Sequence, residues 1–184
     1  MGLKDLFKKN TDEYQIISTE DGLVEAKIKS LKWGEDFSLM SDVVDRLPYA
    51  KKCLDYLDNL PQDVEDRLRK YIVRYYKDFE QYLDEDELTE MGVVDETTVF
   101  DHIHIKSVIV DDDSRPDIVE FHVEGNCDWE PEHGLEFTIS DGKILYVGPF
   151  DDNPPNSERL AYALENFGYY DPDADPSMNY ADKE

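Results

Sequence analysis

The chain has 184 residues, of which 40% are hydrophobic and 12% aromatic, and its net charge is −26. A chain of this length and apolar content builds the core of one domain without needing disulfides. Its charge repels nucleic acids and anionic lipids, and no apolar run reaches the roughly 18 residues of a membrane span. We therefore expect a cytoplasmic protein that binds neither nucleic acid nor membrane.

Acidic residues are concentrated in the second half of the chain. Residues 1–83 carry 14 basic and 17 acidic side chains, whereas residues 84–184 carry 5 basic and 28 acidic ones. A surface of this sign accelerates the encounter with a basic partner. The two cysteines, Cys53 and Cys127, lie far apart in the sequence, which is typical of free thiols in a reducing compartment.

The first half predicts a β-hairpin followed by two helices. Residues 14–18 and 23–28 have strand-like composition and flank an Asp21-Gly22 turn signal, and residues 33–39 predict a third short strand. Apolar residues then recur every three or four positions, which predicts one helix over 48–58 and another from Pro61 onward. The second helix carries the longer apolar stripe, Val64, Leu68, Ile72, Tyr75, Phe79 and Leu83.

Alternation with period two predicts four strands in the second half, at 100–110, 118–124, 135–139 and 144–147. Short turns, such as Asp141-Gly142, join them into an antiparallel meander. Ser157 caps a last helix over 158–167. We expect a single α+β domain over residues 1–168: an N-terminal hairpin, a helical pair covering the four-stranded meander and a C-terminal helix. Residues 169–184 predict a disordered acidic tail.

The segment 127–134 is the densest cluster of chemically active side chains. It contains Asp128, Glu130, Glu132 and His133. Carboxylates and an imidazole suit a metal ion or general acid–base catalysis. Two alternatives compete: a structural role, with Trp129 plugging the sheet and polar side chains bonding the loop backbone, and a role in binding a partner.

His102 and His104 occupy alternate positions of a predicted strand, so both imidazoles share a face. Two imidazoles in this arrangement suit a divalent metal, and His122 on the next strand is a candidate third ligand. His133 in the neighbouring loop is a further candidate. If the register is shifted, these side chains lie on a solvated face and have no such role.

Motifs of several common enzyme classes are absent from the sequence: it holds no G-x-G-x-x-G, P-loop, G-x-S-x-G or H-E-x-x-H. Asp171, Asp173, Asp175 and Asp182 have calcium-loop spacing, but Pro176 stands where that loop needs glycine. We therefore expect no cofactor and favour a protein that is not an enzyme.

Residues 103–153 resemble a family of uncharacterised bacterial proteins with a W-x-x-E-H-G … D-G-K … V-G signature. The matching residues are Trp129, Glu132, His133 and Gly134, then Asp141, Gly142 and Lys143, then Val147 and Gly148. The resemblance covers about a quarter of the chain and implies an intact α+β domain without an established activity. Some similar domains occur beside polymorphic toxins, where immunity proteins are common, so the resemblance also implies a binding protein.

Two functional hypotheses follow. The first is a non-catalytic protein-binding protein, such as an immunity protein whose acidic surface covers a basic toxin. The residues expected to contact the partner are Asp111, Asp112, Asp113, Asp151, Asp152, Trp129 and Glu132. The alternative is a metal-binding protein or metal-dependent enzyme that uses His102, His104 and His122, or the loop 128–133.

Overall fold

The computed structural model describes residues 14–18, 23–173 and 178–184. Its strands are β1 (Gln15–Ser18), β2 (Val24–Ser30), β3 (Gly34–Ser41), β4 (Ile103–Val110), β5 (Glu120–Cys127), β6 (Leu135–Ser140) and β7 (Lys143–Gly148). Its helices are α2 (Leu47–Asp58), α3 (Gln62–Glu80), α4 (Glu85–Met91) and α5 (Glu158–Asn166), with short 3-10 turns η2 (Val44–Arg46) and η3 (Val99–His102). The predicted Asp21-Gly22 turn lies outside the described residues.

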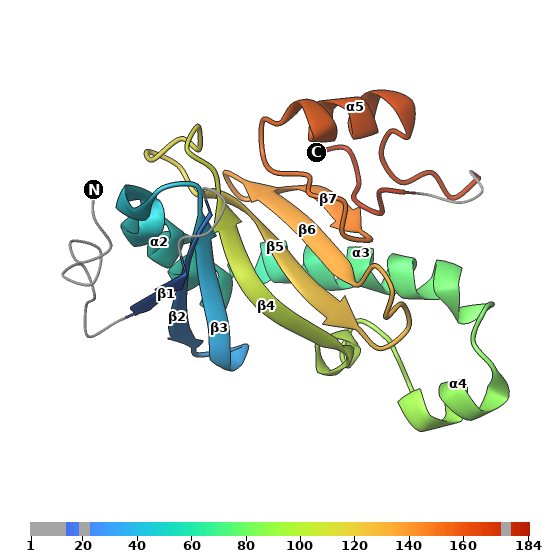
Figure 1. Cartoon of the computed structure of the whole chain (residues 1–184). Helices are drawn as coiled ribbons and strands as arrows, with labels where there is room; N and C mark the ends of the chain where they lie inside the picture. The colour runs from blue at the N-terminus through green and yellow to red at the C-terminus, as the bar shows by residue number, and fades with distance from the viewer. Residues whose placement is uncertain (1–13, 19–22, 174–177) are drawn as a thin grey trace.

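In the described part of the chain, seven strands form one sheet in chain order from β1 to β7 (Figure 1). Neighbouring strands are antiparallel except β3 and β4, which are parallel with Ser38 opposite Ser107. The predicted meander corresponds to β4–β7, but a separate four-stranded sheet is wrong, because β1–β3 extend the same sheet. The chain between β3 and β4 contains α2 and α3 and returns β4 in the same direction as β3, as a parallel pair requires.

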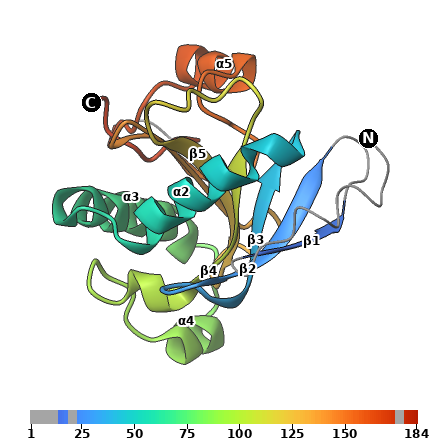
Figure 2. The same cartoon turned by 90° about the vertical axis from the view of Figure 1, so that its left-hand side faces the viewer.

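Helices α2 and α3 cover one face of the sheet (Figure 2). Their apolar positions recur at the helical period, so Leu54, Leu68 and Ile72 are buried with strand residues such as Phe121 and Phe137 in one core. The mixed α+β class and the covering helical pair agree with the sequence prediction. Within the described ranges, no helix combines the length and apolar character needed to cross a membrane.

The C-terminal segment, residues 178–184, is packed against the domain, although the sequence predicts disorder from residue 169 onward. Asn179 and Tyr180 are each 1% exposed. The Tyr180 N–H donates to the Val147 carbonyl at 2.9 Å, and Arg74 of α3 binds Asp182 at 2.8 Å. Backbone pairing with β7 and ion pairs with α3 therefore hold this segment in place, although its polar composition predicts disorder.

Candidate functional site

The H-x-H pair and the loop after β5 meet at one carboxylate. Ile103 pairs with Cys127 across β4 and β5, which places Asp128 beside the start of β4. The two Asp128 oxygens lie 3.1 Å from His102 Nδ1 and 3.0 Å from His104 Nε2. Two clusters that the sequence presents separately therefore form one group of two imidazoles on a shared carboxylate.

A cavity of about 420 Å³ opens beside this group. It is lined by Glu87, Glu90, Met91, Asp101, His102 and Asp128. Of the three α4 residues, Glu87 is positioned by a capping box, in which the Asp84 and Glu87 side chains each accept a hydrogen bond from the other residue's backbone N–H. Four carboxylates and one imidazole give the cavity an affinity for cations rather than anions.

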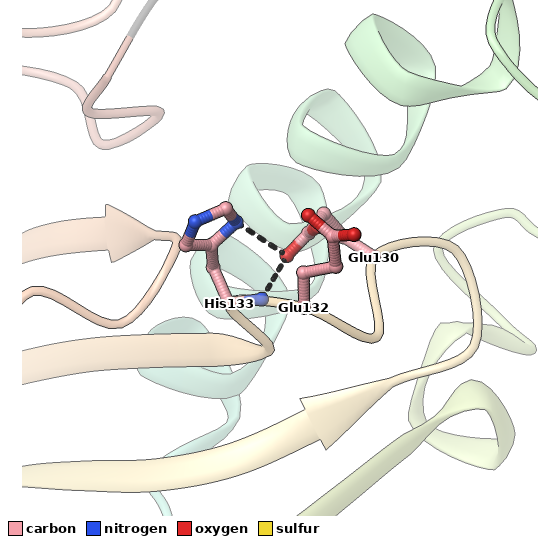
Figure 3. A group of neighbouring side chains, drawn as sticks. All are labelled: Glu130, Glu132 and His133. Atoms are coloured by element: carbon pink, nitrogen blue, oxygen red, sulfur yellow. Dashed lines mark hydrogen bonds and ion pairs between the residues drawn. The ribbon is translucent and has the colours of Figure 1, made fainter.

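Glu130, Glu132 and His133 lie together in the loop 128–134 (Figure 3). Their ligand atoms are all within 4.8 Å of one another, the only such group of three in the described residues. The Glu130 carboxylate already accepts hydrogen bonds from the backbone N–H groups of His133 and Gly134, the second at 3.1 Å. Glu130 therefore holds the loop in shape, and its Oε2 also lies 3.3 Å from Nδ1 of the exposed His133, while Glu132 is exposed beside them.

The backbone at the end of this loop requires glycine at position 134. Its φ is +66°, and a Cβ at this position would lie 2.4 Å from the carbonyl oxygen of Gly125. Any side chain would collide with the backbone of β5. The Gly in the E-H-G motif therefore serves the geometry of the loop.

Trp129 is 2% exposed and belongs to the core. Its ring packs edge-on against Tyr75 and Tyr76, with centroid distances of 5.7 and 5.6 Å. The expectation that Trp129 contacts a partner is therefore not met, because α3 covers the ring. Glu132, by contrast, is exposed on the loop surface.

His122 lies away from the H-x-H pair, in a buried layer on the sheet face opposite α2 and α3. In the pairing of β4 with β5, His122 lies opposite Ile109, whereas His104 lies opposite Asn126, four residues further along β5. His122 and Glu136 are both 0% exposed, and His122 Nδ1 lies 2.9 Å from Glu136 Oε1. The structure thus separates His122 from the metal ligands with which the sequence grouped it.

A second buried carboxylate, Glu120, lies on the same face. It binds Arg115 at 2.7 Å, Ser140 at 3.3 Å and Asn156 at 3.2 Å. Burial acts to raise the pKa of Glu120, but the hydrogen bonds and charge of Arg115, with Asn156, outweigh it and lower the pKa. Glu120 is therefore an ionised, satisfied anchor for the loops above the sheet.

The predicted partner-binding aspartates come from two loops that lie close to each other. Asp112, Asp113, Asp151 and Asp152 are exposed, whereas Asp111 is half-buried. Burial raises the pKa of Asp111 to about 6; among the nearby charges, His122 lowers it and the carboxylates of Asp42, Asp113 and Asp152 raise it. The loops 111–117 and 149–157 thus combine into one acidic surface, hereafter the acidic end.

Both cysteines are buried and free. Burial raises the pKa of the Cys53 and Cys127 thiols to about 12. At neutral pH both groups are therefore protonated, and neither is an activated nucleophile.

Sequence reasoning missed Glu120 and Glu136, which organise the buried polar layer. In each strand they alternate with apolar residues, a pattern typical of a sheet with one solvated face. A usable signal is the composition of residues 149–157, where Asn153 binds Glu136 and Asn156 binds Glu120. An Asn- and Pro-rich loop after a hairpin is a candidate cover for a polar face.

Comparison with known proteins identifies a family for most of the chain. A family model described as "Domain of unknown function (DUF6985)" matches residues 11–154. This range ends before α5 and the C-terminal segment. No curated protein and no solved structure matches the chain.

Proposed function

Since the chain belongs to the DUF6985 family, whose description names no activity, we propose from its own surface chemistry that it is a non-catalytic protein that binds a basic protein partner. The observation that supports this function is the acidic end, where two separate loops bring aspartates together on one surface. A basic toxin such as a nuclease is the kind of partner that this charge fits, and an immunity role is the finer form of the proposal.

Exposed aromatic side chains beside the acidic end are suited to anchor such a partner. Tyr162 of α5 and Phe167, the residue that caps the C-terminal end of α5, are 62% and 51% exposed. They line a hollow of about 440 Å³ together with Asp151, Glu158, Arg159 and Ala163. Charge at the rim raises the association rate, whereas buried aromatic contacts determine most of the affinity. These two residues take the role that the buried Trp129 does not have.

The test is capture of a partner from lysate of the native source by the wild-type protein and two charge variants. The first variant neutralises the acidic end: Asp112→Asn, Asp113→Asn, Asp151→Asn and Asp152→Asn. The matched control removes the same charge from exposed residues elsewhere: Asp66→Asn, Glu85→Gln, Asp86→Asn and Glu96→Gln. We expect one basic protein to be captured at low salt, with association slowed about tenfold or more in the first variant and little in the control.

Two outcomes contradict the proposal. One is an association rate that neither salt nor neutralisation of the acidic end changes. The other is the absence of any captured protein at low salt, which removes the partner itself. Equal slowing in both variants shows that only the overall charge matters, and the assignment to the acidic end is then wrong.

A second candidate function is metal binding at the protein surface. The clustering of Glu130, Glu132 and His133 within 4.8 Å favours it. We expect His133→Ala to remove one equivalent of bound metal if this group is a site, whereas unchanged metal content with normal folding removes it. The double variant His102→Ala and His104→Ala tests the neighbouring group in the same way.

A further inference from the structure

A buried ring nitrogen on the polar face of the sheet has no partner. His122 is 0% exposed, and its Nε2 atom forms no hydrogen bond among the described residues. Its Nδ1 atom lies 2.9 Å from Glu136. An unpaired polar atom in a buried environment costs free energy, so this atom points to a missing interaction.

The surroundings of Glu136 determine which nitrogen of His122 carries the proton. Glu136 also accepts hydrogen bonds from the backbone N–H groups of Asp151 at 2.9 Å and Asn153 at 2.7 Å. Such a set of donors stabilises an ionised carboxylate, which can only accept. The proton therefore lies on Nδ1, and in the neutral ring Nε2 presents a lone pair.

A second unpartnered atom lies on the same face. His122 pairs with Ile109 across β5 and β4, so Asp111, two residues further along the chain and just beyond the end of β4, follows on the same side as a diagonal neighbour. Its Oδ2 atom is buried without a hydrogen-bond partner among the described residues. An imidazole nitrogen and a carboxylate oxygen that both lack a partner thus lie on one face of the sheet, and His122 acts on the charge of Asp111.

The charges around Asp111 are predominantly negative. His122 lowers the pKa of Asp111, whereas the carboxylates of Asp42, Asp113 and Asp152 raise it, and among the described residues no Lys or Arg side chain forms an ion pair with it. The nearby Arg159 is engaged by Asp152 at 3.0 Å. A cation at this position relieves the repulsion and satisfies both unpartnered atoms.

We propose that His122 Nε2 and Asp111 Oδ2 are two ligands of a divalent transition-metal ion of the zinc type. Glu136 then orients the imidazole from behind, the carboxylate–histidine–metal arrangement found in metal sites. A mixed set of imidazole and carboxylate ligands suits zinc, whereas calcium and magnesium prefer oxygen ligands alone. This site adjoins the acidic end, with which it shares Asp111 and Asp113, and it is distinct from the surface groups at His102 and His133.

The third ligand comes from a carboxylate that turns inward when the ion binds. Asp42 and Asp113 are the candidates, because both are exposed and neither forms an ion pair among the described residues. The partial exposure of Asp111 gives the ion a route of entry from the acidic end. Binding is therefore expected to order the loop 111–117.

The test uses the fact that the chain has four histidines. In the variant His102→Ala, His104→Ala and His133→Ala, His122 is the only imidazole left. We expect this protein to bind one equivalent of Zn²⁺ in calorimetry. In the nitrogen NMR spectrum of histidine-labelled protein, the His122 Nε2 signal should shift on zinc addition while Nδ1 stays protonated.

Two further changes in the same background assign the ligands. Asp111→Asn should weaken zinc binding by about tenfold or more, and Glu136→Gln by about 10- to 100-fold because it removes the orientation of the ring. Asp112→Asn, which makes the same chemical change at the next exposed position, should leave affinity within about twofold. Circular dichroism checks that each variant is folded. If the triple-histidine variant is unstable, the zinc affinities of Asp111→Asn and Asp112→Asn are compared in the wild-type chain instead.

The proposal is overturned if the His122 signal does not respond to saturating zinc, which leaves an ordered water as the partner of both atoms. It is also overturned if Asp111→Asn and Asp112→Asn bind zinc equally well. Neither outcome affects the capture experiment on the acidic end, so the two proposals fail separately.

Discussion

Where β5 begins, both faces of the sheet are buried, but their chemistry differs. On β5, Phe121 and Val123 face α2 and α3, while Glu120 and His122 face the loops 111–117 and 149–157. All four residues are 0% exposed. The apolar face gains stability from burial itself, whereas the polar face is stable only where each buried group finds a partner. The apolar face thus provides the core under α2 and α3, and the polar face holds the unpartnered atoms of His122 and Asp111.

The largest expected effect is on the apolar face. Phe121→Ala should lower the free energy of unfolding by about 3–5 kcal/mol, because it leaves a cavity in a core that cannot collapse fully. Denaturant unfolding measures the loss. Ile17→Ala, at a side chain that is 49% exposed, should cost far less. Similar losses at both positions contradict the placement of the core.

Glu136→Ala tests whether the polar face has comparable importance. The change leaves the N–H groups of Asp151 and Asn153 and the His122 ring without their acceptor, so we expect a loss of about 2–4 kcal/mol. Glu124 provides a control, because it pairs directly with Glu136 in the register but is exposed. Glu124→Ala should change stability by less than about 0.5 kcal/mol in the same measurement. Equal losses in the free energy of unfolding for Glu136→Ala and Glu124→Ala show that the buried polar layer does not stabilise the fold.

Asp111→Asn is expected to stabilise the protein at neutral pH. The pKa of Asp111 is raised from 3.8 to about 6 in the folded state, so its contribution to stability is full below pH 3.8 and is lost as pH rises through 6. Removing the charge should therefore gain about 1–2 kcal/mol at pH 7.5 and little at pH 4. Unfolding with a chelator present, repeated across this pH range, measures the gain. A variant that is less stable at pH 7.5 shows that the Asp111 carboxylate is already compensated.

The smallest effect is expected outside both faces. Asp112→Asn and Asp113→Asn alter exposed side chains, so each should change the free energy of unfolding by less than about 0.5 kcal/mol. Thermal unfolding at two salt concentrations measures this change. A large gain at low salt indicates instead that repulsion across the acidic end destabilises the fold as a whole.

The parts of the fold that the sequence predicts well are those built from local contacts. The stripe on α3 and the turns of β4–β7 follow from spacings of a few residues. The pairing of β3 with β4 does not, because Ser38 and Ser107 meet only after the chain has formed α2 and α3. No sequence feature of either strand identifies the other as its parallel neighbour.

The candidate site was predicted in composition but not in arrangement. His102, His104 and Asp128 are visible in the sequence, and the register of β4 and β5 unites them. The polar layer was missed because alternating polar residues are typical of solvated strands. Its cover depends on loop conformations such as the positive φ of Asp152 and Asn156, 56° and 65°, which composition alone does not specify.

The parallel pairing of β3 and β4 also has a consequence for the order of folding events. Hairpin contacts within β1–β3 and within β4–β7 close short loops, whereas joining β3 to β4 closes a loop that contains three helices. Closing a longer loop costs more entropy, and contacts distant in sequence slow folding. Pulsed hydrogen exchange during refolding should therefore find the amides of β6 and β7 protected early and those at the Ser38–Ser107 junction protected last.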